Sequence, residues 1–276
     1  MRIANAVPAR FLPLRESLSP LPRGEEVLRL THLSEREWDE IAGRFPGLGT
    51  QAGRKAARAR KVFRFLVGRA LATTRHRPAW KGGAPNREPT LYLTAHLGDL
   101  RPLRYILRQQ GIAVAHVLGP ENLSRGEIAA EDREFDRRHP VDFPHFFSND
   151  HPHRLRAALG RGSLIAVIDR VFKRHTPAPE AEGRFWAASF LGGFLQIDAH
   201  PLRLSSLAGV PARPIFLTAP GGRLTVSVGD PLPRDPAGAL SRFADLMRAS
   251  AEASPHDFDG FTHRWNPGRA DGKREV

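Results

Sequence analysis

The sequence predicts an α/β fold with a mixed, largely parallel sheet flanked by helices. Short apolar runs, which suit buried strands, alternate along the chain with longer runs of helical periodicity. A strand over 90–95, a helix over 99–110 and a strand over 112–118 form a βαβ pattern, which makes the two strands parallel. The run 164–168 is apolar throughout, as expected of a strand in the middle of a sheet covered on both faces.

The later part of the chain supplies the remaining strands and helices of this fold. Strands are expected at 184–191 and 213–218. The apolar residues of 224–228 alternate with polar ones, which indicates a more peripheral strand. Helices are expected at 200–207 and 236–253.

Two segments between these elements have a different character. Residues 75–89 contain three prolines and are expected to form a polar loop. Residues 121–162 are highly charged and are expected to be mostly helical, with a turn at Gly160-Arg161-Gly162 before the next strand. Gly111 is expected to end the helix over 99–110.

The N-terminal part is expected to be an extension of one α/β domain. Residues 1–33 are rich in proline and arginine and are predicted to be irregular, and helices are predicted within 34–72. The helix over 54–72 has an apolar stripe with basic flanks, which suits either the surface of an anionic membrane or docking on the core. The domain is expected to span 34–267, followed by a polar tail at 268–276.

The composition narrows the class of chemistry and of partner. The 276 residues include no cysteine, which excludes disulfides, thiolate–metal sites and a cysteine nucleophile. The net charge of +13 favours phospholipid head groups, nucleic acid or an acidic carrier protein, although a GC-rich genome would also enrich arginine. Nucleic acid is disfavoured because the basic residues are spread along the chain and only 8% of residues are aromatic.

Nothing in the sequence suggests export or a membrane span. Prolines and charged residues interrupt the first residues, so that no signal-peptide core is visible. No apolar run approaches the roughly 18 residues that a spanning helix requires. A protein that is soluble or bound to a membrane surface is expected.

His96 is the first candidate for a functional residue. It follows the strand over 90–95 directly and stands before the helix over 99–110. Open α/β sheets bind ligands at the carboxyl ends of their strands, and a histidine there can act as a general base. Gly98 would let a substrate or the backbone approach closely. The alternative is a histidine that only caps or packs the loop.

The residues around His96 resemble a known family. The segment His96-Leu97-Gly98-Asp99-Leu100-Arg101 is similar to the His-x4-acid motif, often His-Phe-Gly-Asn-Trp-Glu, of the bacterial lipid A biosynthesis acyltransferases. These enzymes belong to a lysophospholipid acyltransferase-like superfamily. The resemblance covers roughly residues 55–267, and its further segments lie at 165–170, 183–185, 190–192, 204–216 and 263–265.

This resemblance implies a glycerol-3-phosphate acyltransferase-like fold and a particular reaction. The histidine would deprotonate a hydroxyl or amine of a lipid or glycolipid acceptor, which then attacks an acyl thioester of acyl carrier protein or coenzyme A. A carboxylate five residues further on orients the imidazole in this family. The resemblance implies no metal and no organic cofactor, and a peripheral position on the cytoplasmic face of the cell membrane.

The sequence departs from the motif at the position of the carboxylate. Arg101 stands there, and arginine has no acceptor with which to orient an imidazole. Three explanations are open: Asp99 takes over the role, Asp169 approaches from a neighbouring strand end, or the chain binds a lipid or carrier protein without catalysis. Asp99 also suits the N-cap of the following helix, which has Pro102 in its first turn.

Other side chains are candidates for substrate contacts. Asp169 and Arg170 follow the strand over 164–168 as a binding pair or as a structural ion pair. Arg101, Arg170 and Arg184 are candidates for holding a phosphate of the acceptor or of coenzyme A, although each also suits an ordinary basic surface.

Two further groups have an ordinary structural interpretation as well. The aromatic side chains of Phe185, Trp186 and Phe190 suit an acyl groove or simply the core, since they lie on a strand. The histidines around His151 and His153 lack the spacing of helical metal ligands, so that no metal site is expected.

Overall fold

The computed structural model gives the fold of the greater part of the chain from Pro78 onward. The residues that it describes are 50–54, 78–82, 85, 87–98, 101–118, 137, 146–147, 151–169, 185–190, 193–218 and 224–257. The helices expected within 34–72 lie outside these ranges, except for a helical turn over 51–54. The Thr50 hydroxyl accepts a hydrogen bond of 3.0 Å from the N–H of Gly53 at the start of this turn.

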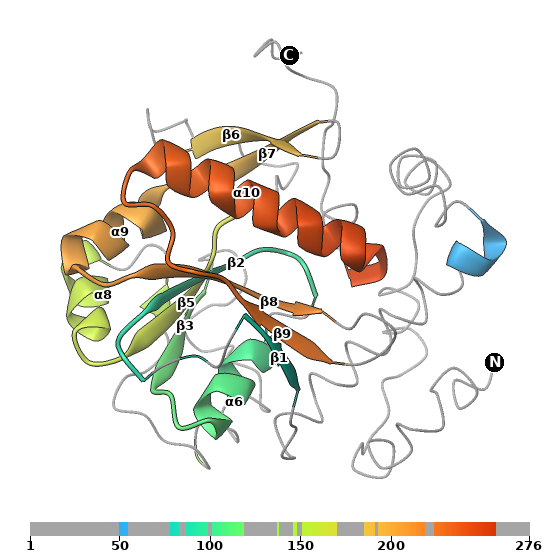
Figure 1. Cartoon of the computed structure of the whole chain (residues 1–276). Helices are drawn as coiled ribbons and strands as arrows, with labels where there is room; N and C mark the ends of the chain where they lie inside the picture. The colour runs from blue at the N-terminus through green and yellow to red at the C-terminus, as the bar shows by residue number, and fades with distance from the viewer. Residues whose placement is uncertain are drawn as a thin grey trace.

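Seven strands form the central sheet, in the order β1-β9-β8-β2-β5-β3-β4 (Figure 1). Strands β8, β2, β5, β3 and β4 are parallel, whereas β9 and β1 run in the opposite direction. The predicted α/β fold with a mixed, largely parallel sheet is therefore confirmed. The strands span Ala79–Lys81 (β1), Leu91–Thr94 (β2), Val114–Leu118 (β3), Phe146–Phe147 (β4), Ser163–Val167 (β5), Ala212–Thr218 (β8) and Thr225–Val228 (β9).

Helices cover both faces of the sheet. Helix α6 (Arg101–Gln109) packs on one face, and α8 (Pro152–Leu159), α9 (His200–Ala208) and α10 (Pro236–Ala253) pack on the other (Figure 1). An antiparallel hairpin of β6 (Phe185–Phe190) and β7 (Gly193–Asp198) lies beside α10. The short 3-10 helix η4 (Pro255–Asp257) follows α10.

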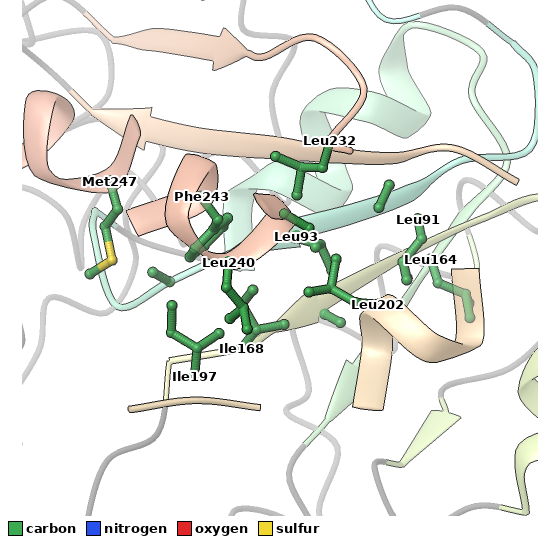
Figure 2. Packing of buried hydrophobic residues seen from close by; sticks show 14 of the residues in the cluster. Leu91, Leu93, Leu164, Ile168, Ile197, Leu202, Leu232, Leu240, Phe243 and Met247 are labelled. Carbon is green, nitrogen blue, oxygen red and sulfur yellow. The ribbon is translucent and has the colours of Figure 1, made fainter. Parts of the chain in front are cut away.

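Alternate residues of the strands enter two separate hydrophobic clusters. Leu91 and Leu93 of β2 belong to the same cluster as Leu240, Phe243 and Met247 of α10; Leu93 lies near Leu240, and Leu91 lies near Leu164 and Leu202 (Figure 2). Tyr92, between the two leucines, points toward α6 instead and joins the second cluster. The period of two residues along a strand thus explains why apolar runs such as 91–93 are buried on both sides.

Local sequence signals set several helix ends. Asp235 caps α10 by accepting the N–H of Gly238 at 2.6 Å, and Pro236 occupies the first turn, where a missing N–H costs no hydrogen bond. Gly111 and Gly209 follow α6 and α9 with φ of 78° and 69°, a conformation that glycine adopts without a Cβ penalty. The expected helix ends at Gly111 and near residue 253 are confirmed.

One sequence prediction was wrong in part. The expected loop over 75–89 contains β1, a three-residue strand that pairs with β9 at the edge of the described sheet and is too short to show a pattern. Of the stretch over 121–162 that was expected to be mostly helical, the described residues include helix α8 and the two-residue strand β4, and the rest lies outside the described residues. Strand β7 was not predicted, and it pairs with β6 in a hairpin outside the central sheet.

The order of the strands refines the predicted βαβ unit. Strands β2 and β3 are parallel, but they are not neighbours, because β5 lies between them and pairs with both. The central position predicted for the apolar run 164–168 is therefore confirmed. In the part of the chain that the structure describes, no helix is long and apolar enough to cross a membrane.

Candidate active site

His96 and Asp169 lie at the carboxyl ends of two neighbouring parallel strands. Thr94 of β2 is paired with Val167 of β5, and His96 and Asp169 each stand two residues beyond that pair. Parallel strands that continue in register bring equivalent positions side by side. The strand pairing therefore brings together two residues that are 73 positions apart in the sequence.

The connections that follow β2 and β5 lie on opposite faces of the sheet. After β2 the chain enters α6, which packs on one face of the sheet. After β5 its next described elements are β6, β7 and α9, which pack on the opposite face. Such a change of direction opens a crevice at the carboxyl edge of an α/β sheet, and ligands bind there.

The carboxylate of Asp169 contacts His96 at two different groups. Its Oδ1 lies 3.0 Å from the ring Nδ1 of His96. Both of its oxygens also accept the backbone N–H of His96, each at 3.0 Å. One carboxylate therefore fixes both the main chain and the ring of the histidine.

These contacts determine which nitrogen of His96 can accept a proton. An ionised carboxylate only accepts hydrogen bonds, so the Nδ1 that faces Asp169 carries the hydrogen. In the neutral ring the lone pair is then on Nε2, which is the nitrogen able to act as a base. This is the arrangement of a histidine held by a carboxylate in hydrolase triads.

The two side chains differ in their access to solvent. The side chain of His96 is 24% exposed, whereas that of Asp169 is 5% exposed. Asp169 is held in place by the strands beside it, because it forms an antiparallel bridge with Ile197 of β7. The N–H of Asp198 also donates to the carbonyl of Ile168 at 2.7 Å. A buried carboxylate thus supports a partly exposed imidazole.

The loop after His96 is tied to two other parts of the fold. Gly98, with φ of 77°, donates its N–H to the carbonyl of Asp257 in η4 at 2.6 Å. A Cβ at this position would lie 1.6 Å from the carbonyl oxygen of Leu217 in β8. The expectation that Gly98 permits a close backbone approach is confirmed, and the group that approaches it is the neighbouring strand.

The support that η4 provides to the loop of His96 was not predicted from the sequence. Asp257 is fully buried, and its Oδ2 accepts the hydroxyl of Ser254 at 2.6 Å. Neither residue belongs to a recognisable motif. Their only signal was an acid and a serine directly after a long amphipathic helix, which is common at helix ends.

Several predicted site residues cannot be compared with this geometry. Asp99, Arg170 and Arg184 lie outside the described residues. Arg101 begins α6, and the position of its side chain is outside the description as well. Their predicted roles remain predictions.

Other candidates have structural partners. Phe190 is 1% exposed in the core below α10, and Trp186 packs partly buried against the same cluster. His151 caps α8, since its Nδ1 accepts the N–H of His153 at 3.4 Å, and the two rings stack with centroids 5.1 Å apart. Among the residues that the structure describes, no group of three or more His, Asp or Glu is arranged for a metal ion.

Comparison with known proteins adds no assignment. No protein-family model matches the chain, and no curated protein matches its sequence. The pair His96–Asp169 and its place in the fold are therefore the features that indicate a function.

Proposed function

We propose that this protein is an acyltransferase that moves a fatty acyl group from an acyl thioester to a hydroxyl or amine acceptor. His96 is the general base, and Asp169 is the carboxylate that orients it. The observation that carries the proposal is the 3.0 Å contact between Nδ1 of His96 and Oδ1 of Asp169 at the change of direction between β2 and β5. A histidine and a carboxylate in this relation are suited to activate a weak nucleophile.

The proposed reaction needs only one base and one thioester. Nε2 of His96 takes the proton of the acceptor hydroxyl while its oxygen attacks the thioester carbonyl carbon. The tetrahedral intermediate collapses, the C–S bond breaks, and the departing thiolate takes the proton from the imidazolium. Asp169 stabilises the positive charge on the ring during this sequence, as the aspartate of a hydrolase triad does.

The position of Asp169 answers the difficulty raised by Arg101. The resembling acyltransferases keep a carboxylate five residues after the histidine, where this chain has arginine. Asp169 supplies a carboxylate from the adjacent strand, so the proposed chemistry does not require one within the motif. Asp169 was expected among the substrate contacts, but its 5% exposure and its contacts to His96 favour the orienting role.

The resemblance supplies the proposed partners. The donor is an acyl carrier protein or coenzyme A thioester, and the acceptor is a lipid or glycolipid. The protein would work as a peripheral protein on the cytoplasmic face of the cell membrane. Arg101, Arg170 and Arg184 are proposed contacts for an anionic group of either substrate, and Asp99 is proposed to assist at the start of α6.

A thioester-consumption assay with candidate acceptors tests the proposal. Acyl transfer should be present in the wild type and lost in His96→Ala. Asp169→Asn should lower kcat by about 10⁴-fold, the loss seen when the aspartate of a hydrolase triad is changed to asparagine. Asp198→Asn is the matched control, because Asp198 is partly exposed and accepts the N–H of His200 rather than that of a proposed catalytic residue.

The same assay separates catalysis from binding alone. Equal acyl transfer by the wild type and His96→Ala would disprove the assigned mechanism. Saturable binding of an acyl chain without thioester consumption, unchanged in Asp169→Asn, would favour a chain that binds a lipid or carrier protein instead.

A further inference from the structure

The outer surface of α8 and α9 concentrates positive charge. Neither 151–163 nor 199–211 contains an acidic residue, whereas 224–257 contains five acids and three arginines. The two helices and the turns that flank them therefore carry no carboxylate side chain to offset their basic side chains. We call this the α8–α9 surface, and its exposed basic side chains and imidazoles are His151, His153, Arg154, Arg156, Arg161, His200 and Arg203.

A single leucine stands among these charges. Leu207 of α9 is 63% exposed and is the only large hydrophobic side chain that is exposed among the described residues. It follows Arg203 by four positions, so both side chains lie on the same outward side of the helix. Helices α8 and α9 pack against each other at one side of the molecule (Figure 1).

The α8–α9 surface begins at the carboxyl end of the central parallel strands, where His96 lies. Helix α9 starts two residues after Asp198, whose N–H donates to Ile168 next to Asp169. Helix α8 leads through a short turn into the start of β5. It therefore runs from the carboxyl end of the strands to their amino end. The first turns of both helices therefore lie at the catalytic end of the sheet.

We propose that the α8–α9 surface docks on an anionic lipid surface and places the carboxyl end of the sheet, with His96, beside the head groups. Arginines pair with lipid phosphates, and an exposed leucine enters the boundary between head groups and acyl chains. A protein partner fits less well, since protein interfaces depend on a cluster of buried apolar and aromatic side chains. The identity of the lipid as substrate rests on the proposed function, whereas the docking itself does not.

Vesicle co-sedimentation of the full chain tests the docking. The probes are vesicles of phosphatidylcholine alone and vesicles in which part of it is replaced by phosphatidylglycerol. The wild type should bind only the second kind, and less strongly as salt is added. The double variant Arg156→Glu/Arg203→Glu should bind the anionic vesicles at least about 30-fold more weakly than the wild type. Each arginine near an anionic surface contributes about 1 kcal/mol to binding, and about 1.4 kcal/mol corresponds to a tenfold change in affinity.

A matched variant controls for net charge. Arg234→Glu/Arg242→Glu changes the net charge by the same amount on an exposed part of the chain beside and within α10, and it should bind like the wild type. Leu207→Ala should weaken binding several-fold without changing the charge. Circular dichroism and a melting curve establish that each variant is folded.

The outcomes separate the two proposals. Equal weakening by both double variants, or equal binding of neutral and anionic vesicles, would overturn the docking surface. Retention on immobilised polyglutamate without vesicle binding would overturn it in favour of an acidic protein partner. A water-soluble thioester and a soluble acceptor report the acyltransferase separately, and Arg156→Glu/Arg203→Glu should leave that rate unchanged.

Discussion

Gly98 lies against the carbonyl oxygen of Leu217 so closely that a Cβ at position 98 would be 1.6 Å from that oxygen. The two residues belong to the loop after β2 and to the adjacent strand β8. The contact presses the loop that carries His96 onto the sheet. A side chain of any size at position 98 would move that loop.

Gly98→Ala should therefore destabilise the fold by more than about 2 kcal/mol, because a positive φ and a backbone clash add together. Gly209→Ala is the matched control. Gly209 also has a positive φ of 69°, but a Cβ there would meet nothing within 4 Å. It should cost only about 1 kcal/mol. Urea unfolding of both variants measures the difference, and equal losses would show that the clash with Leu217 is relieved at little cost.

His96 and Asp169 should behave as one catalytic unit in mutagenesis. If Asp169 acts only through the ring of His96, its removal has no further effect once the imidazole is gone. The double variant His96→Ala/Asp169→Ala should therefore retain the same residual acyl transfer as His96→Ala. A double variant with a lower kcat than His96→Ala, because the losses of the two single variants multiply, would contradict this. It would assign Asp169 a separate contact with the substrate.

Ser254 should affect both stability and activity, although it lies after α10. Its hydroxyl donates at 2.6 Å to Asp257, whose carbonyl in turn accepts the N–H of Gly98. Ser254→Ala removes a donor from a buried carboxylate, at a cost of about 1–3 kcal/mol. We expect a lower kcat with little change in KM, because the loop of His96 loses part of its support.

Ser206→Ala provides the comparison for that variant. The Ser206 hydroxyl also donates to an oxygen of its own segment, the carbonyl of Leu202 at 3.2 Å, but Ser206 is exposed on α9. Its loss should change stability by about 0.5 kcal/mol or less. Equal effects of the two variants on kcat would refute a special role for Ser254.

Tyr92 should make stability depend on alkaline pH. Burial raises the pKa of Tyr92 above its usual 10.0, against the opposing effects of the Thr90 side chain and the charge of Arg213. Above pH 10 the unfolded chain releases this proton first, so it binds fewer protons than the folded chain and stability falls as pH rises. Between about pH 9 and about pH 11, Tyr92→Phe should lose less stability than the wild type in urea unfolding. Equal losses of stability in Tyr92→Phe and the wild type over this range would show that other groups cause the pH dependence.

The elements best predicted from the sequence are those whose signals are local. The limits expected for the helix over 236–253 agree with α10, because Asp235 and Pro236 mark its start and its apolar stripe continues to the end. The run 164–168, which makes up most of strand β5, was placed in the middle of the sheet because it is apolar throughout. Strand β1 escaped prediction because three residues at an edge carry no periodicity.

The site could be predicted only in part for a similar reason. His96 was found because a strand, a histidine and a glycine are adjacent in the sequence. Asp169 was recognised only as one of two possible carboxylates, beside Asp99, since its pairing with His96 depends on which strands are neighbours and in which register. Those are properties of the whole sheet, and no local pattern in the sequence encodes them.

The insertion of β5 between β2 and β3 has a consequence for the order in which the chain can fold. A ribosome that has made β2, α6 and β3 has produced two strands that do not pair with each other. Their shared neighbour is synthesised later, so both keep open edges that can associate with other chains. His96 gains its carboxylate only when a segment 73 residues further on has emerged and inserted. Assembly of the candidate site is therefore a late step, and contacts so distant in sequence make folding slow.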